Sequence, residues 1–170
     1  KNSAFRFTTD IHNPNTPDNK NFDTLVKYAY YERANVLKDT SVVFGLQGTP
    51  WIDKEEKAWK YRSVYKTPSD AAGLLTSADF GAAVKGKFAF GDYHILIANG
   101  AGYNKEETSH KKDVQARVSF NTGKNMPTVS LYADKGGEAG GRDDMLGILL
   151  DQQIKGLSYG ATYVVDKSKA

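Results

Sequence analysis

FGAAVKGKFAFGDYHILIAN, residues 80–99, has apolar side chains at alternate positions over much of its length. Val84 and Phe88 fall on one face of this run, and Lys85 falls on the opposite face. A period of two predicts β-strands with one apolar face. Gly91-Asp92, between the two halves, is typical of a tight turn. We therefore expect an antiparallel hairpin here.

The same alternation recurs along most of the chain. In residues 24–36 it predicts Val26, Tyr28 and Tyr30 on the apolar face, with Lys27 on the polar face. About nine strands are expected in total, over residues 3–11, 24–36, 41–48, 80–90, 93–99, 113–120, 128–134, 145–153 and 157–166. A connection near Lys38-Asp39 makes the second and third strands a hairpin. The fold class predicted is all-β and antiparallel.

Residues 49–79 interrupt the pattern. This segment of about thirty residues has no strand period, and so long an irregular connection in a compact domain is usually functional. Asp53 is expected to cap a short helical turn, and Pro68 to start another. We expect the rest to be irregular.

Composition excludes several classes of protein. The 170 residues suit a single domain, 1–170. Hydrophobic residues make up 39% and the mean hydropathy is −0.56, without an apolar run long enough for a membrane-spanning helix. There is no Cys, which excludes disulfides and thiolate metal sites. The net charge of +3 gives no case for nucleic-acid binding.

Two architectures share period-two strands: a soluble β-sandwich or barrel, whose apolar face is the core, and an outer-membrane barrel, whose apolar face meets lipid. Aromatic residues of the apolar faces lie near predicted strand ends, as interfacial girdles would place them. Short turns also alternate with long polar loops, as in outer-membrane barrels. Both features favour the membrane architecture.

One region of the chain resembles a known family. GLQGTPWIDKEEKAWKYRSVYKT (residues 45–67), GLLTSADFGAAVKGKF (73–88), IANGAGYNKEE (97–107) and KDVQARVSF (112–120) together resemble bacterial outer-membrane porins of the phosphate-selective, anion-selective type. The resemblance implies a transmembrane β-barrel of about sixteen strands in the outer membrane of a Gram-negative cell. It also implies a homotrimer that contacts the lipid bilayer and lipopolysaccharide and passes small anions such as phosphate.

In such porins a long loop folds toward the lumen, and residues 49–79 occupy the matching place. The sequence departs from the family pattern in its odd strand number and in the missing terminal aromatic residue. These departures predict a segment of a larger barrel. The alternative is a soluble cell-surface β-sandwich with a binding or structural role, in which Trp51 and Trp59 could stack on a sugar.

In the porin interpretation, basic residues on the polar faces and in the long loop form a path for anions. They are Lys27, Arg33, Lys60, Arg62, Lys66, Lys85, Lys87 and Arg117. The competing interpretation is a solvated polar face with scattered charges, and the sequence leaves both open.

Other kinds of site find little support. The loop 12–23 could bind Ca²⁺ through Asp18, Asn19 and Asp23, but it lacks the carboxylate spacing of an EF-hand. No nucleophile, base and orienting residue can be assembled from the sequence. We therefore expect neither an enzyme nor a bound metal or cofactor.

Overall fold

A computed structural model describes residues 2–12, 21–107, 110–123, 126–136, 144–154 and 157–166. These residues form nine strands and two helices. The strands are β1 (Ser3–His12), β2 (Asp23–Leu37), β3 (Thr40–Gly48), β4 (Ala78–Phe88), β5 (Gly91–Ala98), β6 (Asp113–Asn121), β7 (Thr128–Lys135), β8 (Met145–Ile154) and β9 (Leu157–Asp166). The helices are α1 (Pro50–Trp59) and α2 (Pro68–Ala71).

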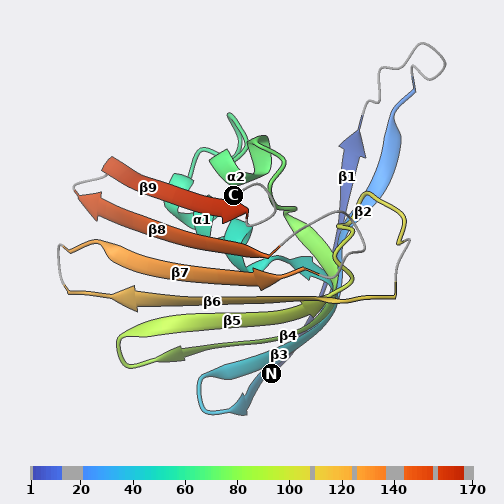
Figure 1. Ribbon diagram of the computed structural model, residues 1–170. Helices are drawn as coiled ribbons and strands as arrows, with labels where there is room; N and C mark the ends of the chain where they lie inside the picture. Colours follow the sequence, from blue (N-terminus) through green and yellow to red (C-terminus); the bar gives the residue numbers. More distant parts are fainter. Residues whose placement is uncertain are drawn as a thin grey trace.

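All nine strands belong to one antiparallel sheet in which each pairs with the next in sequence, β1 through β9. The prediction of an all-β antiparallel fold is confirmed. The sheet is open, because β1 and β9 form its two edges and do not pair within the described residues. Figure 1 shows it bending around α1 and α2, with β1 and β2 standing steeply against the other strands. Neither helix is long and apolar enough to span a membrane.

The two faces of the sheet have inverted polarity. Large apolar side chains cover the outer face, where Phe44 is 61% exposed and Ile97 53% exposed. The inner face, toward the helices, instead buries polar groups, among them Asp79, Gln115 and Ser119. In a soluble protein the hydrophobic effect would place these two sets the other way round. This inverted distribution of polar and apolar side chains is the most unusual feature of the fold.

A β-bulge in β2 changes which residues face outward. Thr8 pairs with Tyr28 and Thr9 with Val26, so Lys27 is an extra residue opposite β1. The bulge shifts the alternation by one position, and Tyr28, only 9% exposed, faces inward. The prediction that Tyr28 and Tyr30 lie on the outer face with Val26 was therefore wrong.

The connection between β3 and β4 is more ordered than predicted. Helix α1 begins after Thr49 with Pro50 at its start, so Asp53 lies within the first turn and does not cap it. The helix ends at Trp59, and the residue that caps it, Lys60, has a left-handed φ of 62°. Pro68 starts α2, as expected. The turn between β4 and β5 lies at residues 89–90, and Gly91 already begins β5, which corrects the predicted turn at Gly91-Asp92.

Helix α1 is fixed to the inner face by a small apolar core. Trp51 and Ile52 are fully buried and pack with Tyr132, Met145 and Leu149, and with Leu75 from the same connection. The ring of Trp51 lies 5.3 Å from that of Tyr132, measured between centroids. The indole also occupies the space over Gly147 of β8, where a Cβ would approach it to 3.2 Å. This packing helps to hold the helix in the hollow of the sheet.

Candidate functional site: a charged groove between α1 and the sheet

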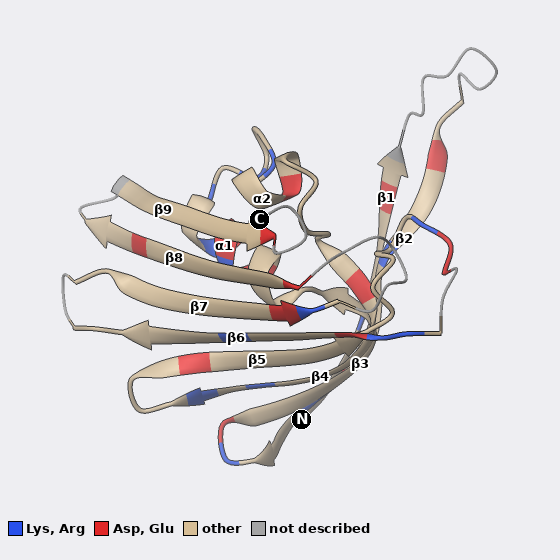
Figure 2. Ribbon diagram, in the orientation of Figure 1, with Lys and Arg blue, Asp and Glu red and all other residues tan. Residues whose placement is uncertain are grey.

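A groove of about 490 Å³ lies between α1 and the inner face of the sheet from β2 to β6. Five basic and four acidic side chains line it. They are Lys54, Lys57, Lys85, Lys87 and Arg117, with Glu32, Asp39, Asp53 and Asp92. Figure 2 shows basic and acidic residues interspersed on α1, β4 and β5. The groove therefore carries mixed charge with a small basic excess.

Arg117 of β6 forms the inner wall of the groove. Its side chain is 7% exposed, and its Nη2 lies 2.5 Å from Asp92 Oδ1. Its Nε donates to the carbonyl oxygen of Pro50 at 3.1 Å, and its Nη1 donates to the hydroxyl of Ser119. A buried guanidinium needs such partners, because an unpaired buried charge is costly. Arg117 is thus occupied in joining α1 to the sheet.

Lys85 and His94 are neighbours of Arg117 in a row of cross-strand pairs. Lys85 pairs with His94, and His94 pairs with Arg117. The ammonium of Lys85 lies 3.0 Å from the Glu32 carboxylate. His94 is 4% exposed, and its Nε2 has no hydrogen-bond partner among the described residues. The row places two of the basic residues predicted for the anion path, Lys85 and Arg117, in one groove, each beside a carboxylate.

Two lysines of the groove differ from the others. Lys57 of α1 and Lys87 of β4 line it without an ion pair in the described part of the chain. Lys54, three residues before Lys57, is held 2.8 Å from Asp151 of β8. Lys57 and Lys87 are therefore the cations best able to attract a solute anion.

Asp53 faces the same lysines from the first turn of α1. Burial raises the pKa of its carboxyl group, and the Glu56 carboxylate raises it further. The positive charges of Lys57 and Lys85, and more weakly that of Arg117, lower the pKa. Desolvation of the charged carboxylate is the largest of these effects. The basic excess of the groove thus depends on the protonation of Asp53.

A second basic cluster lies apart from the groove. Arg62 and Lys66 line a cavity of about 410 Å³ with Asp10 and Asp70. Arg62 pairs with Asp70 at 3.2 Å and with Glu56 at 2.8 Å, and Lys66 lies 3.7 Å from Asp70. Lys27 approaches Asp10 from the bulge at 3.8 Å. These cations are also neutralised locally.

No family model, curated protein or solved structure matches this chain.

Of the eight predicted path residues, three meet in the groove and three meet at the second cavity. Lys60 is exposed at the end of α1 and lines neither. Arg33 was wrongly placed, because the bulge turns it to the outer face, where it pairs with the outward-facing Val42. Its Nη1 donates to Ser3 Oγ at 3.1 Å.

The sequence interpretation missed two groups of residues. Lys54 and Lys57 were left out because the segment had no strand period, although their spacing of three places them on one side of a helix. The carboxylate partners Glu32 and Asp92 lie on other strands, and sequence spacing gives no signal for such pairing.

Metal ligation has little basis in the described ranges, which contain no group of three His, Cys, Asp or Glu residues suited to a metal ion. Two of the three residues considered for Ca²⁺, Asp18 and Asn19, lie outside those ranges.

Proposed function

We propose that this chain forms part of the wall of an outer-membrane β-barrel that admits small anionic or polar solutes such as phosphate by passive diffusion. Residues 49–77, the part of the predicted 49–79 loop that precedes β4, act as a loop that narrows the lumen. The single observation that carries the proposal is the inverted polarity of the sheet, with apolar side chains outside and charged groups inside.

The outer face suits a lipid environment. Within the described strands, register places only two charged side chains on it, Arg33 and Lys135. Between them the face is lined by exposed side chains such as Phe44, Ile97 and Leu131. An apolar surface continuous over nine strands is far larger than a soluble monomer tolerates. Contact with the bilayer, including lipopolysaccharide, accounts for it.

The strand lengths agree with a membrane wall. Eight of the nine strands have between 8 and 11 residues, and β2 has 15. A tilted transmembrane strand needs about 9–11 residues. Phe88, Phe90 and Phe120 also contact one another beside the turn between β4 and β5, as in an interfacial aromatic girdle.

Electrostatics supports a weak preference for anions. Four carboxylates line the groove together with its five basic residues. Two of these carboxylates pair directly with Lys85 and Arg117. Lys57 and Lys87 supply the positive potential that remains. A solute anion would therefore meet a lowered barrier without a tight binding site.

A soluble β-sandwich is less well supported. Such a fold packs two sheets face to face about 10 Å apart. In the described residues all strands belong to one sheet, and its apolar face has no covering layer. Assembly as a homotrimer is part of the porin proposal and would cover a fraction of that face.

Planar-bilayer recordings of the purified protein test the proposal. Reversal potentials across a salt gradient should indicate a modest preference for anions, which Lys57→Gln combined with Lys87→Gln should reduce or reverse. Lys60→Gln, in the same connection but outside the groove, is the matched control. Absence of channels, or a cation preference in the unmodified protein, would contradict the proposal.

A further inference from the structure

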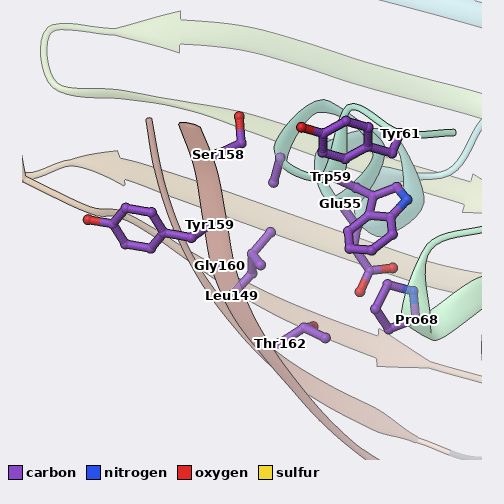
Figure 3. Close-up of a pocket in the computed structure, with 10 residues that line it drawn as sticks. Glu55, Trp59, Tyr61, Pro68, Leu149, Ser158, Tyr159, Gly160 and Thr162 are labelled. Atoms are coloured by element: carbon purple, nitrogen blue, oxygen red, sulfur yellow. The ribbon is translucent and has the colours of Figure 1, made fainter. Parts of the chain in front are cut away.

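A separate cavity of about 240 Å³ lies on the other side of α1 from the charged groove. It is enclosed by the end of α1, the residues that follow the helix, and the inner face of β8 and β9. Figure 3 shows Trp59, Tyr61 and Pro68 on one side of it, with Ser158, Gly160 and Thr162 along the strand on the other. The two walls differ in chemistry.

The helix side presents aromatic rings. Trp59 and Tyr61 contact each other edge to face, with ring centroids 6.0 Å apart. Trp59 is 39% exposed and Tyr61 is 53% exposed. The fully buried Trp51 has its indole Nε1 bonded to Ser69 Oγ at 3.0 Å. Trp59 and Tyr61 thus keep ring surface available to a ligand, and Trp51 does not.

The strand side combines Leu149 and Tyr159 with small and hydroxyl-bearing residues, Ser158, Gly160 and Thr162. Gly160 and Thr162 face inward, since Thr162 pairs with the buried Leu149. The hydroxyl oxygen of Thr162 is buried and has no hydrogen-bond partner in the part of the chain that the structure describes. A buried polar atom without a partner is uncommon in a folded protein and carries a desolvation cost. A ligand hydroxyl would satisfy it.

The cavity also favours a neutral ligand. Among the described residues that line it there is no lysine or arginine. The one carboxylate among its described lining residues, Glu55, is 3% exposed and accepts hydrogen bonds from the backbone N and the hydroxyl of Ser69, at 3.2 and 2.9 Å. Glu55 is therefore a fixed part of the wall, in contrast to the carboxylates of the charged groove.

We propose that this cavity binds a pyranose sugar. A pyranose ring has an apolar C–H face, which would pack on Trp59 and Tyr61, and hydroxyl groups at its edge, which would bond Thr162 and Ser158. Purely apolar ligands would leave Thr162 unsatisfied, and anions would find no cation among the described lining residues. The inference rests on this cavity alone and does not depend on the proposed anion path.

Tryptophan fluorescence provides a direct test. The chain has two Trp residues, and only Trp59 borders the cavity. Maltose, added to the full chain in detergent, should shift the emission with a saturable dependence in the millimolar range. Sodium phosphate should leave the emission unchanged. Cyclohexanol, which has a ring of similar size but a single hydroxyl group, should bind more weakly than maltose.

Two variants make the test specific. Thr162→Val removes the hydroxyl at nearly constant volume, and Tyr61→Ala removes one ring. Each should weaken maltose binding roughly fivefold. Tyr65→Ala, an exposed ring of the same connection outside the cavity, is the matched control and should leave the affinity unchanged.

Failure of the unmodified chain to respond to maltose would overturn the inference, as would equal binding of maltose by Thr162→Val and the unmodified chain. Thr162→Val keeps the test valid even if Tyr61→Ala fails to fold. Because ion selectivity is measured separately, a negative sugar result leaves the proposed anion path standing, and a loss of channel activity leaves the sugar result interpretable.

Discussion

The Arg117 guanidinium donates from Nε to the carbonyl oxygen of Pro50 at 3.1 Å, so a strand from the middle of the sheet holds the first residue of α1. The same side chain neutralises Asp92. One residue thus fixes the position of the helix and sets the charge of the groove wall.

Arg117→Met should destabilise the fold by about 2–3 kcal/mol, because it breaks a charge-assisted hydrogen bond and leaves Asp92 unpaired. Urea unfolding monitored by circular dichroism measures the loss. Arg33→Met, a change of the same kind on the outer face, should stay within about 0.5 kcal/mol of the unmodified protein. Equal effects of the two substitutions would show that Arg117 does not anchor α1.

The two tryptophans should differ sharply in their contribution to stability. Trp51→Ala removes a fully buried indole from the core under α1 and should cost about 3–5 kcal/mol. Trp59→Ala removes a partly exposed ring and should cost about 1 kcal/mol. Thermal unfolding of both variants measures the difference. A small effect of Trp51→Ala would argue against the packing of α1 on β7 and β8.

Asp53 should make stability depend on pH. The pKa of its carboxyl group is raised by burial, so the folded state holds a proton more tightly than the unfolded state. Stability should therefore be gained as pH falls through this raised pKa, and lost again at higher pH, where the buried carboxylate is ionised. Asp53→Asn should raise the urea midpoint at neutral pH and lose this advantage in acid.

Asp39→Asn is the control for this prediction. Asp39 lines the same groove but is exposed, and its φ of 54° suits Asn as well as Asp. Its replacement should leave the urea midpoint at neutral pH close to that of the unmodified protein. A profile identical in Asp53→Asn and the unmodified protein would contradict the role of Asp53.

A charge on the outer face should separate the membrane proposal from the soluble alternative. In a lipid-facing position Ile97→Lys should cost about 2–4 kcal/mol near the bilayer midplane, and folding into lipid vesicles should decrease accordingly. Val64→Lys, in the exposed connection between the helices, should fold into vesicles normally. Improved solubility of Ile97→Lys with unchanged folding in detergent-free buffer would favour the soluble module.

Much of the sheet could be predicted from the sequence because strand alternation is a local property. The hairpin at Lys38-Asp39 and the inward position of Lys85 both follow from counting residues, and both are confirmed. Counting residues assigns the wrong face beyond Lys27, where the β-bulge lies. A bulge depends on how β2 fits against β1, and no residue type in YYER marks the shift of Arg33 to the outer face.

The site was less predictable, for a different reason. Sequence reasoning selected basic residues by their strand parity but could not find their partners. Asp92 of β5 reaches Arg117 on the adjacent strand β6, and Asp70 reaches Arg62 across the connection between the helices. Such pairs are set by tertiary packing. They turn a predicted row of free cations into a largely neutral wall. Lys57, from a helix that the strand pattern did not reveal, is one of two lysines of the groove without an ion pair among the described residues.

The consecutive pairing of nine strands also fixes direction. In an antiparallel meander, odd-numbered strands all run the same way, so the two edges β1 and β9 point toward the same end of the sheet. They cannot meet as antiparallel neighbours. If a second copy of the sheet were inserted in the same orientation, β9 of each copy would lie beside β1 of the other. These two strands run in the same direction, so neither junction could be antiparallel. A barrel that contains this sheet and uses only antiparallel pairs must therefore place an odd number of additional strands between β9 and β1, which makes its total even.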